Sequence, residues 1–416
     1  ALAPLPDSWV NPVHFQPNID GMWQSIPSAV VDMIHAQEID VIVKYGMGLL
    51  KTPSDLGDIP ILSFHHGDPA NYRGRPAVFY EMLNKENYVG ITVQRLTNIL
   101  DSGPILAFAE AQVIPYSYKK TMRNVYYSSK YLLKKAILSH MHNKTISTAP
   151  SKKLFKLPKN ITVVKLSLIL CFRFVKKILH LSLYDRYWRI AFSTQPIDFF
   201  SDNKLTLTGI DVLGESSDYS FVADPFFCPQ GKFLRFEGMS KRTGLGELAQ
   251  IPICKTEDRS VVMMGPHLSY PMSYMHDNVE FLFPEMSGLA KQKKFTIENG
   301  AIVDTTTLSE FDGIAVKDPT ILNYKGDSYC FFSEGTTANF ILHLWVDKSQ
   351  LGKFKPHPLS PICISPSNAR MGGNIVCSND DLFRFGQCCN TTYGEALAVM
   401  KIDILSPTSY VETRIG

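Results

Sequence analysis

Two short motifs in the first half of the chain contain residues suited to acid–base chemistry. The motif SFHHGDPANYRG at residues 63–74 places Ser63, His65 and His66 at the end of an apolar, strand-like run. Open α/β sheets build their sites at the carboxyl ends of strands. The motif LDSG at residues 100–103 places Asp101 in a glycine-containing turn. Because a histidine oriented by a carboxylate is a common general base, we predict that His65 and Asp101 meet.

The second half contains a different set of candidate residues, arranged in a repeat. Similar motifs occur as ADPF at 223–226, SYP at 269–271, KDPT at 317–320, HPL at 357–359 and NAR at 368–370. The first three are spaced by about 45 residues, which is the period of a four-stranded propeller blade. Acids that converge in a propeller channel suit glycoside chemistry, which uses two carboxyl groups with separated pKa values. The structural alternative is that each aspartate only caps a turn before its proline.

The elements that must position these residues differ between the two halves. Apolar, β-branched runs at Ile39–Val43, Ile61–Phe64 and Gly90–Gln94 predict buried parallel strands. Helices are predicted at Ala29–Gln37, Ala77–Leu83 and Lys120–His140. From about Ile190 onward, short apolar runs alternate with turn residues, which predicts an all-β part. We predict an α/β domain over 1–142, a linker and helix over 143–189, and a five-bladed β-propeller over 190–416, with a β-sandwich as the alternative.

The α/β part resembles the folate-dependent formyltransferases, a family that includes methionyl-tRNA and sugar N-formyltransferases. The matching segments are the run DVIVKYG at 40–46, the His65 motif, GITV at 90–93 and LDSG at 100–103. The resemblance implies a Rossmann-like parallel sheet. It also implies transfer of a formyl group from 10-formyltetrahydrofolate, the co-substrate, to an amine.

The same resemblance assigns roles to individual residues. His65 and Asp101 match the catalytic histidine and aspartate of the family. The loop against which the pterin stacks falls on residues 44–50, so the expected folate-binding residues are Lys44, Tyr45, Gly46, Leu50 and Asp101.

The family's catalytic asparagine falls on Ser63. Formyl transfer passes through a tetrahedral oxyanion that needs hydrogen-bond donors. A serine hydroxyl is shorter than a carboxamide, and His66 is the other candidate donor. A formyltransferase-like domain without activity is therefore the rival hypothesis.

The repeated motifs of the second half, with LFRFGQ at 382–387 and YG at 393–394, also resemble a known family. They are similar to the glycosidase-related five-bladed propeller of glucosamine inositolphosphorylceramide transferase-like proteins. The resemblance implies three candidate acids, Asp224, Glu285 and Asp318. It also implies a set of candidate sugar or phosphate contacts, which are His357, Arg370, Arg384 and Gln387.

Charge is distributed unevenly along the chain. Of the 42 basic residues, 17 lie between Tyr118 and Arg189, together with one of the 39 acids. The apolar run at 163–184 contains four of these bases. This pattern predicts an amphipathic helix in peripheral contact with an anionic membrane; a domain-packing helix with a solvated basic face is the alternative. No nucleic-acid-binding module is visible, so no nucleic-acid partner is expected.

The eight cysteines include no CxxC pair. We therefore expect reduced thiols and no metal site. No secretory signal is visible, and the expected location is cytoplasmic, at the inner membrane face.

Together these features lead to two principal hypotheses. The first is a formyltransferase-like enzyme that formylates an amino sugar, supplied as a sugar nucleotide or glycolipid, and carries a carbohydrate-binding propeller. The second is a glycan-active or glycan-binding propeller, related to glycosidases and glycosyltransferases, attached to an inactive formyltransferase-like domain. A scaffold without either activity is a third possibility.

Overall fold

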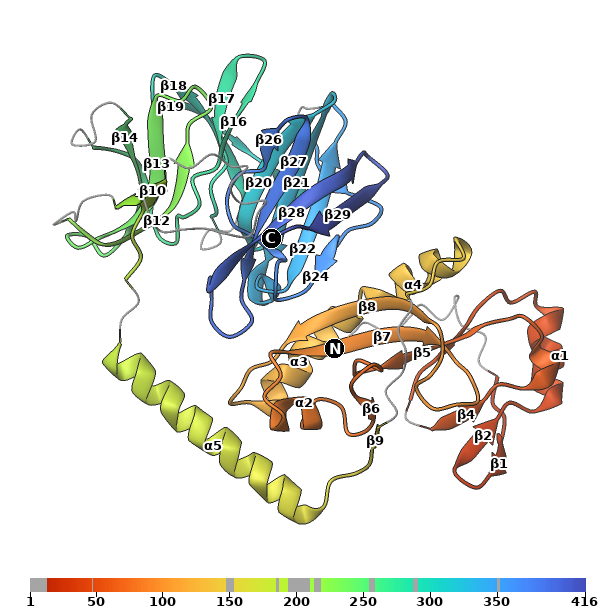
Figure 1. The fold of residues 1–416 in the computed structure, drawn as a ribbon. Helices are drawn as coiled ribbons and strands as arrows, with labels where there is room; N and C mark the ends of the chain where they lie inside the picture. Colours follow the sequence, from red (N-terminus) through yellow and green to blue (C-terminus); the bar gives the residue numbers. More distant parts are fainter. Residues whose placement is uncertain are drawn as a thin grey trace. The chain divides into compact units, whose positions relative to one another are not determined.

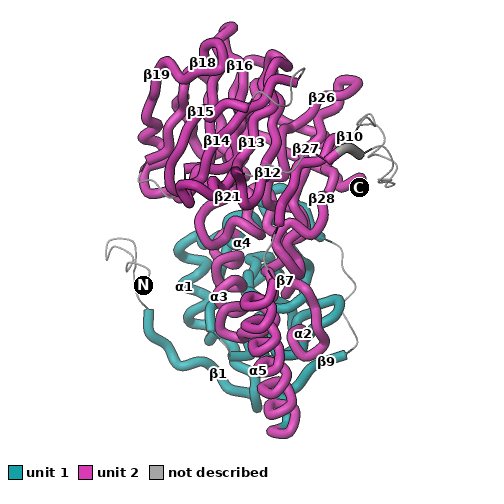
Figure 2. The backbone as a smooth tube through the Cα atoms, turned by 90° about the vertical axis from the view of Figure 1, so that its left-hand side faces the viewer, with its two compact units in different colours: residues 1–80, 90–108, 132–159 teal, residues 81–89, 109–131, 160–416 magenta. Residues whose placement is uncertain are grey.

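The computed structural model describes residues 13–46, 48–146, 153–184, 187–193, 210–212, 218–253, 259–286, 291–349 and 352–416. The chain divides into two compact units, coloured separately in Figure 2. The first comprises residues 1–80, 90–108 and 132–159, and the second comprises 81–89, 109–131 and 160–416. The predicted boundaries at 142 and 189 remain predictions, and residues 147–152 of the predicted linker lie outside the described residues.

The sheet that presents the His65 motif is mixed rather than parallel. Its order is β3 (Ile42–Lys44), β5 (Ile61–His65), β7 (Tyr88–Arg95) and β8 (Ile105–Gln112). Strands β3 and β5 are parallel, but β5 and β7 are antiparallel, so the prediction of an all-parallel sheet was wrong. The only α-helix between β5 and β7 is α2 (Phe79–Leu83). Five helical residues span about 7.5 Å, too little to carry the chain back along the length of β5 for a parallel crossover.

One longer helix precedes this sheet in the sequence, and three follow it. The first is α1 (Ser28–Ala36), and the others are α3 (Tyr118–Ser129), α4 (Leu132–Met141) and α5 (Asn160–Leu183). The single helix predicted over Lys120–His140 is two helices, because a turn at Lys130 and Tyr131 interrupts it. The Ser117 side chain caps α3 by accepting a hydrogen bond from the backbone N–H of Lys120 at 3.3 Å.

Two small sheets complete this half. One contains β1 (Asn18–Asp20), β2 (Trp23–Ser25) and β4 (Leu49–Lys51). The other pairs β6 (Arg73–Gly74) with β9 (Leu154–Phe155) in parallel. Strand β9 lies in the segment predicted to be only a linker. Aromatic stacking explains the difference, since the Phe155 ring lies 5.4 Å from Tyr72 and 4.4 Å from Tyr80.

Among the described helices, none combines the length and the apolar character needed to cross a membrane.

The second half is built from antiparallel sheets of consecutive strands (Figure 1). A short hairpin of β10 (Ala191–Ser193) and β11 (Ile210–Val212) comes first. The next two sheets contain β12 (Tyr219–Phe227), β13 (Phe233–Ser240), β14 (Gly246–Pro252) and β15 (Ser260–Gly265), then β16 (Ser273–His276), β17 (Val279–Leu282), β18 (Lys293–Glu298) and β19 (Ala301–Thr307).

Two five-stranded sheets follow. The third contains β20 (Val316–Tyr324), β21 (Asp327–Glu334), β22 (Ile341–Asp347), β23 (Lys355–Pro356) and β24 (Cys363–Ile364). The fourth contains β25 (Arg370–Met371), β26 (Val376–Ser378), β27 (Asp381–Cys388), β28 (Ala396–Leu405) and β29 (Tyr410–Arg414). The described residues thus hold four sheets of four or five strands, and the fifth predicted blade remains a prediction.

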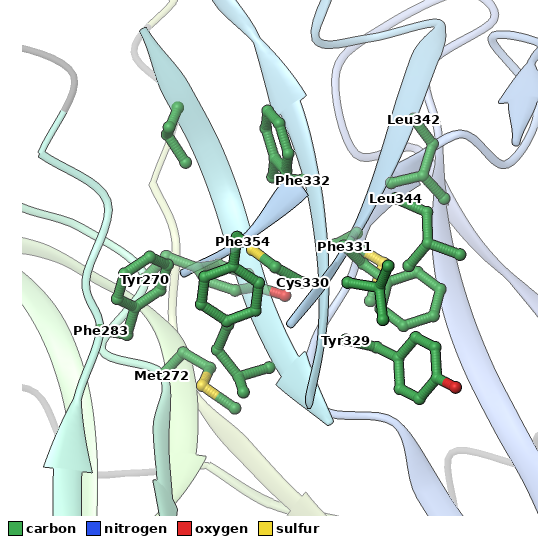
Figure 3. Close-up of a cluster of buried hydrophobic side chains, with 14 of the residues drawn as sticks. Tyr270, Met272, Phe283, Tyr329, Cys330, Phe331, Phe332, Leu342, Leu344 and Phe354 are labelled. Atoms are coloured by element: carbon green, nitrogen blue, oxygen red, sulfur yellow. The ribbon is translucent and has the colours of Figure 1, made fainter. Parts of the chain in front are cut away.

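The largest apolar cluster among the described residues contains side chains in or next to all four of these sheets. Phe331 and Phe332 of β21 pack with Leu342 and Leu344 of β22 (Figure 3). Phe226 of β12, residues next to β16 and residues of the fourth sheet complete the cluster. All of these side chains are almost fully buried. Because a single sheet cannot bury both of its faces, this shared core holds neighbouring sheets together.

Candidate functional site

The His65–Asp101 pair lies at the carboxyl end of β5, an inner strand of the mixed sheet. His65 is the last residue of β5, and Asp101 lies in the loop between β7 and β8. The imidazole Nδ1 lies 3.4 Å from the Asp101 carboxylate, and both side chains are nearly buried. The two groups therefore meet as the sequence indicates, while a catalytic role for them remains a prediction.

Backbone groups occupy the remaining polar atoms of this pair. His65 Nε2 makes a 2.9 Å hydrogen bond with the carbonyl oxygen of Tyr72, and the N–H of Gly74 donates to Asp101 at 2.9 Å. A carbonyl only accepts hydrogen bonds, so Nε2 must carry the proton there. Nδ1 faces the Asp101 carboxylate, so neither ring nitrogen directs a lone pair at open space.

Gly67 is required for the close approach of His65 to the Tyr72 carbonyl. A Cβ atom at Gly67 would lie 2.7 Å from His65 Nε2 and 2.8 Å from the Tyr72 oxygen. No side chain fits at such distances. The glycine of the HHG motif thus serves the packing of the loop.

The two predicted oxyanion donors lie on either side of His65 in the sequence. Ser63 is buried in β5, where it pairs with Lys44 on one side and with Gln94 on the other. His66 is half-buried and stacks on Phe64 at 6.4 Å. Burial, followed by the neighbouring His65, lowers the pKa of His66 to about 4, so the His66 ring is neutral at pH 7.

The predicted folate loop is divided between two elements. Lys44 ends β3, and its ammonium donates to the carbonyl of Gly46 at 3.1 Å. Burial lowers the pKa of Lys44, and the nearby Asp101 carboxylate opposes that shift. Tyr45 is exposed and stacks on Phe64, whereas Leu50 belongs to β4 and packs in a small apolar cluster. Lys44 is therefore the loop residue whose charge lies closest to the histidine–aspartate pair.

A second and denser site lies among the C-terminal sheets. Four carboxyl groups interact with one another there; we call them the acidic cluster, and they are Asp224, Glu237, Glu285 and Asp318. They come from β12, β13, the residues after β17, and β20, so three successive sheets contribute. Glu285 and Asp318 are almost fully buried, while Asp224 and Glu237 are partly exposed.

Two basic side chains bind two neighbouring members of the acidic cluster. Arg370 of β25 donates to both Asp318 oxygens, from Nε at 2.5 Å and from Nη2 at 3.2 Å. Lys317 donates to Glu285 at 2.5 Å, and the N–H of Asp318 donates to the same carboxylate at 3.1 Å. The planar guanidinium matches two carboxylate oxygens, so Arg370 fixes the orientation of Asp318.

Some carboxyl groups of the acidic cluster keep their protons at neutral pH. Four carboxyl groups face two cations, and burial disfavours uncompensated charge. Burial and then Asp224 raise the pKa of Glu237 to about 9. Burial raises the pKa of Asp318 to about 8 against the pull of Arg370. Burial would also raise the pKa of Glu285, but the Lys317 ammonium reverses this and holds it below its usual value. Neutral and ionised carboxyl groups therefore lie side by side.

Three residues in or next to this site share a backbone feature. Asp224, Tyr270 and Asp318 each precede a proline and each adopt a left-handed conformation, with φ of 49°, 51° and 47°. Around both aspartates the strand pairing is irregular, as at a β-bulge. Bulges redirect side chains, and left-handed non-glycine residues concentrate at functional sites. The repeated X-Pro pattern thus reflects one structural device used in three successive sheets.

Sequence reasoning missed three members of this site. Glu237 shares a hydrogen bond with Asp224 from the adjacent strand. The Tyr270 hydroxyl bonds Thr320 at 2.9 Å, and the Arg370 guanidinium lies 4.6 Å from the Tyr393 ring centroid. The SYP repeat could have identified Tyr270. Glu237 gives no motif signal, because it becomes a neighbour of Asp224 only through strand pairing.

Of the four predicted sugar or phosphate contacts, two lie at the cluster and two do not. Gln387 donates to Asp318 at 3.5 Å, as a neighbour of Arg370. Arg384 is fully buried and donates to Glu412 twice at 2.7 Å, and His357 Nε2 bonds the Ser406 carbonyl at 3.0 Å. Both side chains thus bond protein groups away from the acidic cluster, and their role as ligand contacts remains a prediction.

Within the described part of the chain, no group of three His, Cys, Asp or Glu residues is arranged to hold a metal ion.

The antiparallel sheets, with a site formed by carboxyl groups and Arg370, define a predominantly β-sheet module. Residues 201–416 match the family model described as glucosamine inositolphosphorylceramide transferase 1, N-terminal. The chain belongs to this family.

Similar curated proteins bear the same name. Glucosamine inositolphosphorylceramide transferase 1 of Arabidopsis thaliana is 27% identical over 215 residues, covering 47% of this chain and 27% of that protein. The protein of that name in Oryza sativa subsp. japonica is 28% identical over 221 residues, covering 47% and 28%. The chain thus spans little more than a quarter of the length of these relatives.

Solved structures with some similarity include a family-43 β-xylosidase/α-arabinofuranosidase from a compost microbial metagenome. It has a TM-score of 0.38 and 10% identity, and covers 49% of this chain and 78% of that one. HypX from Aquifex aeolicus has a TM-score of 0.26 and 16% identity, and covers 35% of this chain and 28% of that one.

Proposed function

We propose that the C-terminal half is a glycan-active module that binds the sugar headgroup of a glycolipid at the acidic cluster. The single observation that carries this proposal is the convergence of four carboxyl groups and Arg370 from successive sheets. Sugar chemistry needs one neutral carboxyl group as acid and one carboxylate as base or nucleophile. Glu237 supplies the first, and Glu285, ionised beside Lys317, has the protonation state of the second.

The family name suggests the class of ligand. The relatives are named as transferases of glucosamine inositolphosphorylceramide. We propose that this chain binds the hexosamine and inositol phosphate portion of such a lipid. Carboxylates would accept hydrogen bonds from sugar hydroxyls, and Arg370, with the ring of Tyr393 beside it, would border the sugar.

The sheet arrangement supports a propeller for this module. We propose that the four described sheets are blades of a five-bladed propeller, with β10 and β11 in the fifth blade. Consecutive antiparallel sheets of about four strands are typical of propeller blades. The first and third of these sheets also share an irregular strand pairing at an Asp-Pro motif.

The test is binding of a soluble glucosamine–inositol phosphate headgroup, measured by isothermal titration calorimetry. Arg370→Met should weaken binding at least tenfold. Arg259→Met is the matched control, because Arg259 pairs with Asp218 away from the cluster, and it should leave binding unchanged. Equal binding by all three proteins would reject the acidic cluster as the glycan site.

A second candidate function, formyl transfer from 10-formyltetrahydrofolate, has one observation in its favour. His65 and Asp101 lie together, as the resemblance to the formyltransferases implies. However, the Tyr72 carbonyl occupies the nitrogen that would take the amine proton. We propose that the α/β part is formyltransferase-like and inactive.

This proposal is tested by incubating the full chain with 10-formyltetrahydrofolate and amino-sugar nucleotides. No tetrahydrofolate should appear. Turnover that His65→Ala abolishes would refute the proposal and restore formyl transfer as the function of this half.

A further inference from the structure

Helix α5 exposes a long row of large apolar side chains. Val164, Leu168, Phe172, Val175, Leu179 and Leu183 are each between 48% and 71% exposed. Their spacing of three and four residues places them on one side of the helix, which Figure 1 shows as continuous. The function proposed above uses none of these residues.

The opposite side of α5 is the side that packs. Leu166 is buried, and Arg173 donates to the carbonyls of Met82 and Pro115 at 3.4 Å and 3.2 Å. Lys177 lies over the ring of Tyr116. With 100° of rotation per residue, the packed residues lie roughly opposite the exposed row. The apolar row is therefore the outer face of this helix.

All five basic side chains of α5 gather on one part of its circumference. Lys165, Arg173, Lys176, Lys177 and His180 fall within an arc of about 120°, and the remaining arc of about 240° contains no charged residue. Lys165 and Lys176 lie at one rim of the uncharged arc, and Lys177 lies at the other. Long lysine side chains in such positions extend their ammonium groups to a polar layer while their stems stay apolar.

This pattern favours a lipid surface over a second copy of the helix. A coiled-coil seam is narrow and is flanked by charges of both signs. Here the uncharged arc is wide, the flanking charges are all basic, and α5 contains no acid. Two copies would bring lysine against lysine, whereas anionic headgroups complement the same charges. A spanning orientation would place Arg173 near the centre of the bilayer, where a charge is unfavourable.

We propose that α5 lies in the plane of an anionic membrane surface, such as the cytoplasmic leaflet. The apolar face that contains Leu168, Phe172 and Leu179 inserts between acyl chains, and Lys165 and Lys176 bind headgroup phosphates. This surface is distinct from the acidic cluster and goes beyond glycan binding. It would hold the module against the layer in which a glycolipid substrate resides.

The test is co-sedimentation of the full chain with vesicles of phosphatidylcholine alone or with about one third phosphatidylserine, a composition that mimics an anionic leaflet. The chain should bind the anionic vesicles, and Phe172→Glu should weaken binding at least tenfold. Phe227→Glu is the matched control, since Phe227 of β12 is 54% exposed and lies outside α5; it should bind like the unchanged chain. Lys176→Gln should weaken binding about fivefold and reduce its dependence on salt.

Two results would overturn the proposal. One is equal vesicle binding by the unchanged chain and Phe172→Glu, with circular dichroism showing that both are folded. The other is a dimer in sedimentation velocity that Phe172→Glu dissociates, which would assign this face to a second copy. Because the vesicles contain no glycolipid, failure of glycan binding at the acidic cluster would not affect the outcome.

Discussion

Replacing Glu237 by glutamine should stabilise the protein at neutral pH while impairing glycan binding. Burial and the adjacent Asp224 raise the pKa of Glu237 to about 9 in the folded state. In the unfolded chain the pKa of a glutamate is about 4.3. Between these two pH values the folded state retains a proton that the unfolded state releases. The free energy of unfolding therefore falls as pH rises through this interval.

The magnitude follows from the same two values. Each pH unit above the unfolded pKa lowers the free energy of unfolding by about 1.4 kcal/mol, or by about 3.7 kcal/mol in total at pH 7. Solvent screening at this partly exposed side chain and sharing of its proton with Asp224 reduce the expected gain to about 1–2 kcal/mol. Glutamine is neutral at every pH and can still donate a hydrogen bond to Asp224. For a unit of this size, the melting temperature should rise by about 2–8 °C.

The assay is urea-induced unfolding of both proteins at pH 5, 6, 7 and 8. The stabilising effect of Glu237→Gln should be smallest at pH 5 and grow toward pH 8. Glu412→Gln is the matched control, because it removes the charge that compensates the fully buried Arg384. It should destabilise the protein by about 3 kcal/mol. A Glu237→Gln protein that is less stable than the unchanged chain, with the same pH dependence, would refute the charge balance derived for the acidic cluster.

Three further predictions concern single side chains. Gly67→Ala should displace the His65 imidazole, because the new Cβ would lie 2.7 Å from its Nε2; a shift of the His65 ring resonances in NMR spectra checks this. Burial lowers the pKa of His66 to about 4, so stability should fall as pH drops from about 6.5 to 4, by up to about 3 kcal/mol. His66→Gln should remove that loss in acid-unfolding curves. Gly386→Ala should cost about 1–3 kcal/mol in thermal unfolding, because its Cβ would lie 2.2 Å from the Asn368 carbonyl oxygen.

Local sequence patterns predicted much of the secondary structure. The apolar runs ending at Phe64 and Gln94 correspond to β5 and β7, and the apolar basic segment forms α5. The X-Pro repeat indicated a series of similar sheets. Such features are local, because they depend on side-chain periodicity and on turn residues within a few positions. Strand direction is not local, which is why the antiparallel pairing of β5 with β7 was missed.

The candidate sites were likewise predicted in their local features but not in their long-range contacts. The sequence by itself determined that Asp224 and Asp318 recur before prolines in similar motifs, and that His65 is followed downstream by an aspartate in a glycine-containing turn. Only the tertiary structure decided that Glu237 joins Asp224, that Arg384 pairs with Glu412, and that the Tyr72 carbonyl bonds Nε2 of His65. The physical reason is that burial and hydrogen-bond partners depend on segments far apart in the chain, and these set both the charge of a carboxyl group and the availability of a ring nitrogen.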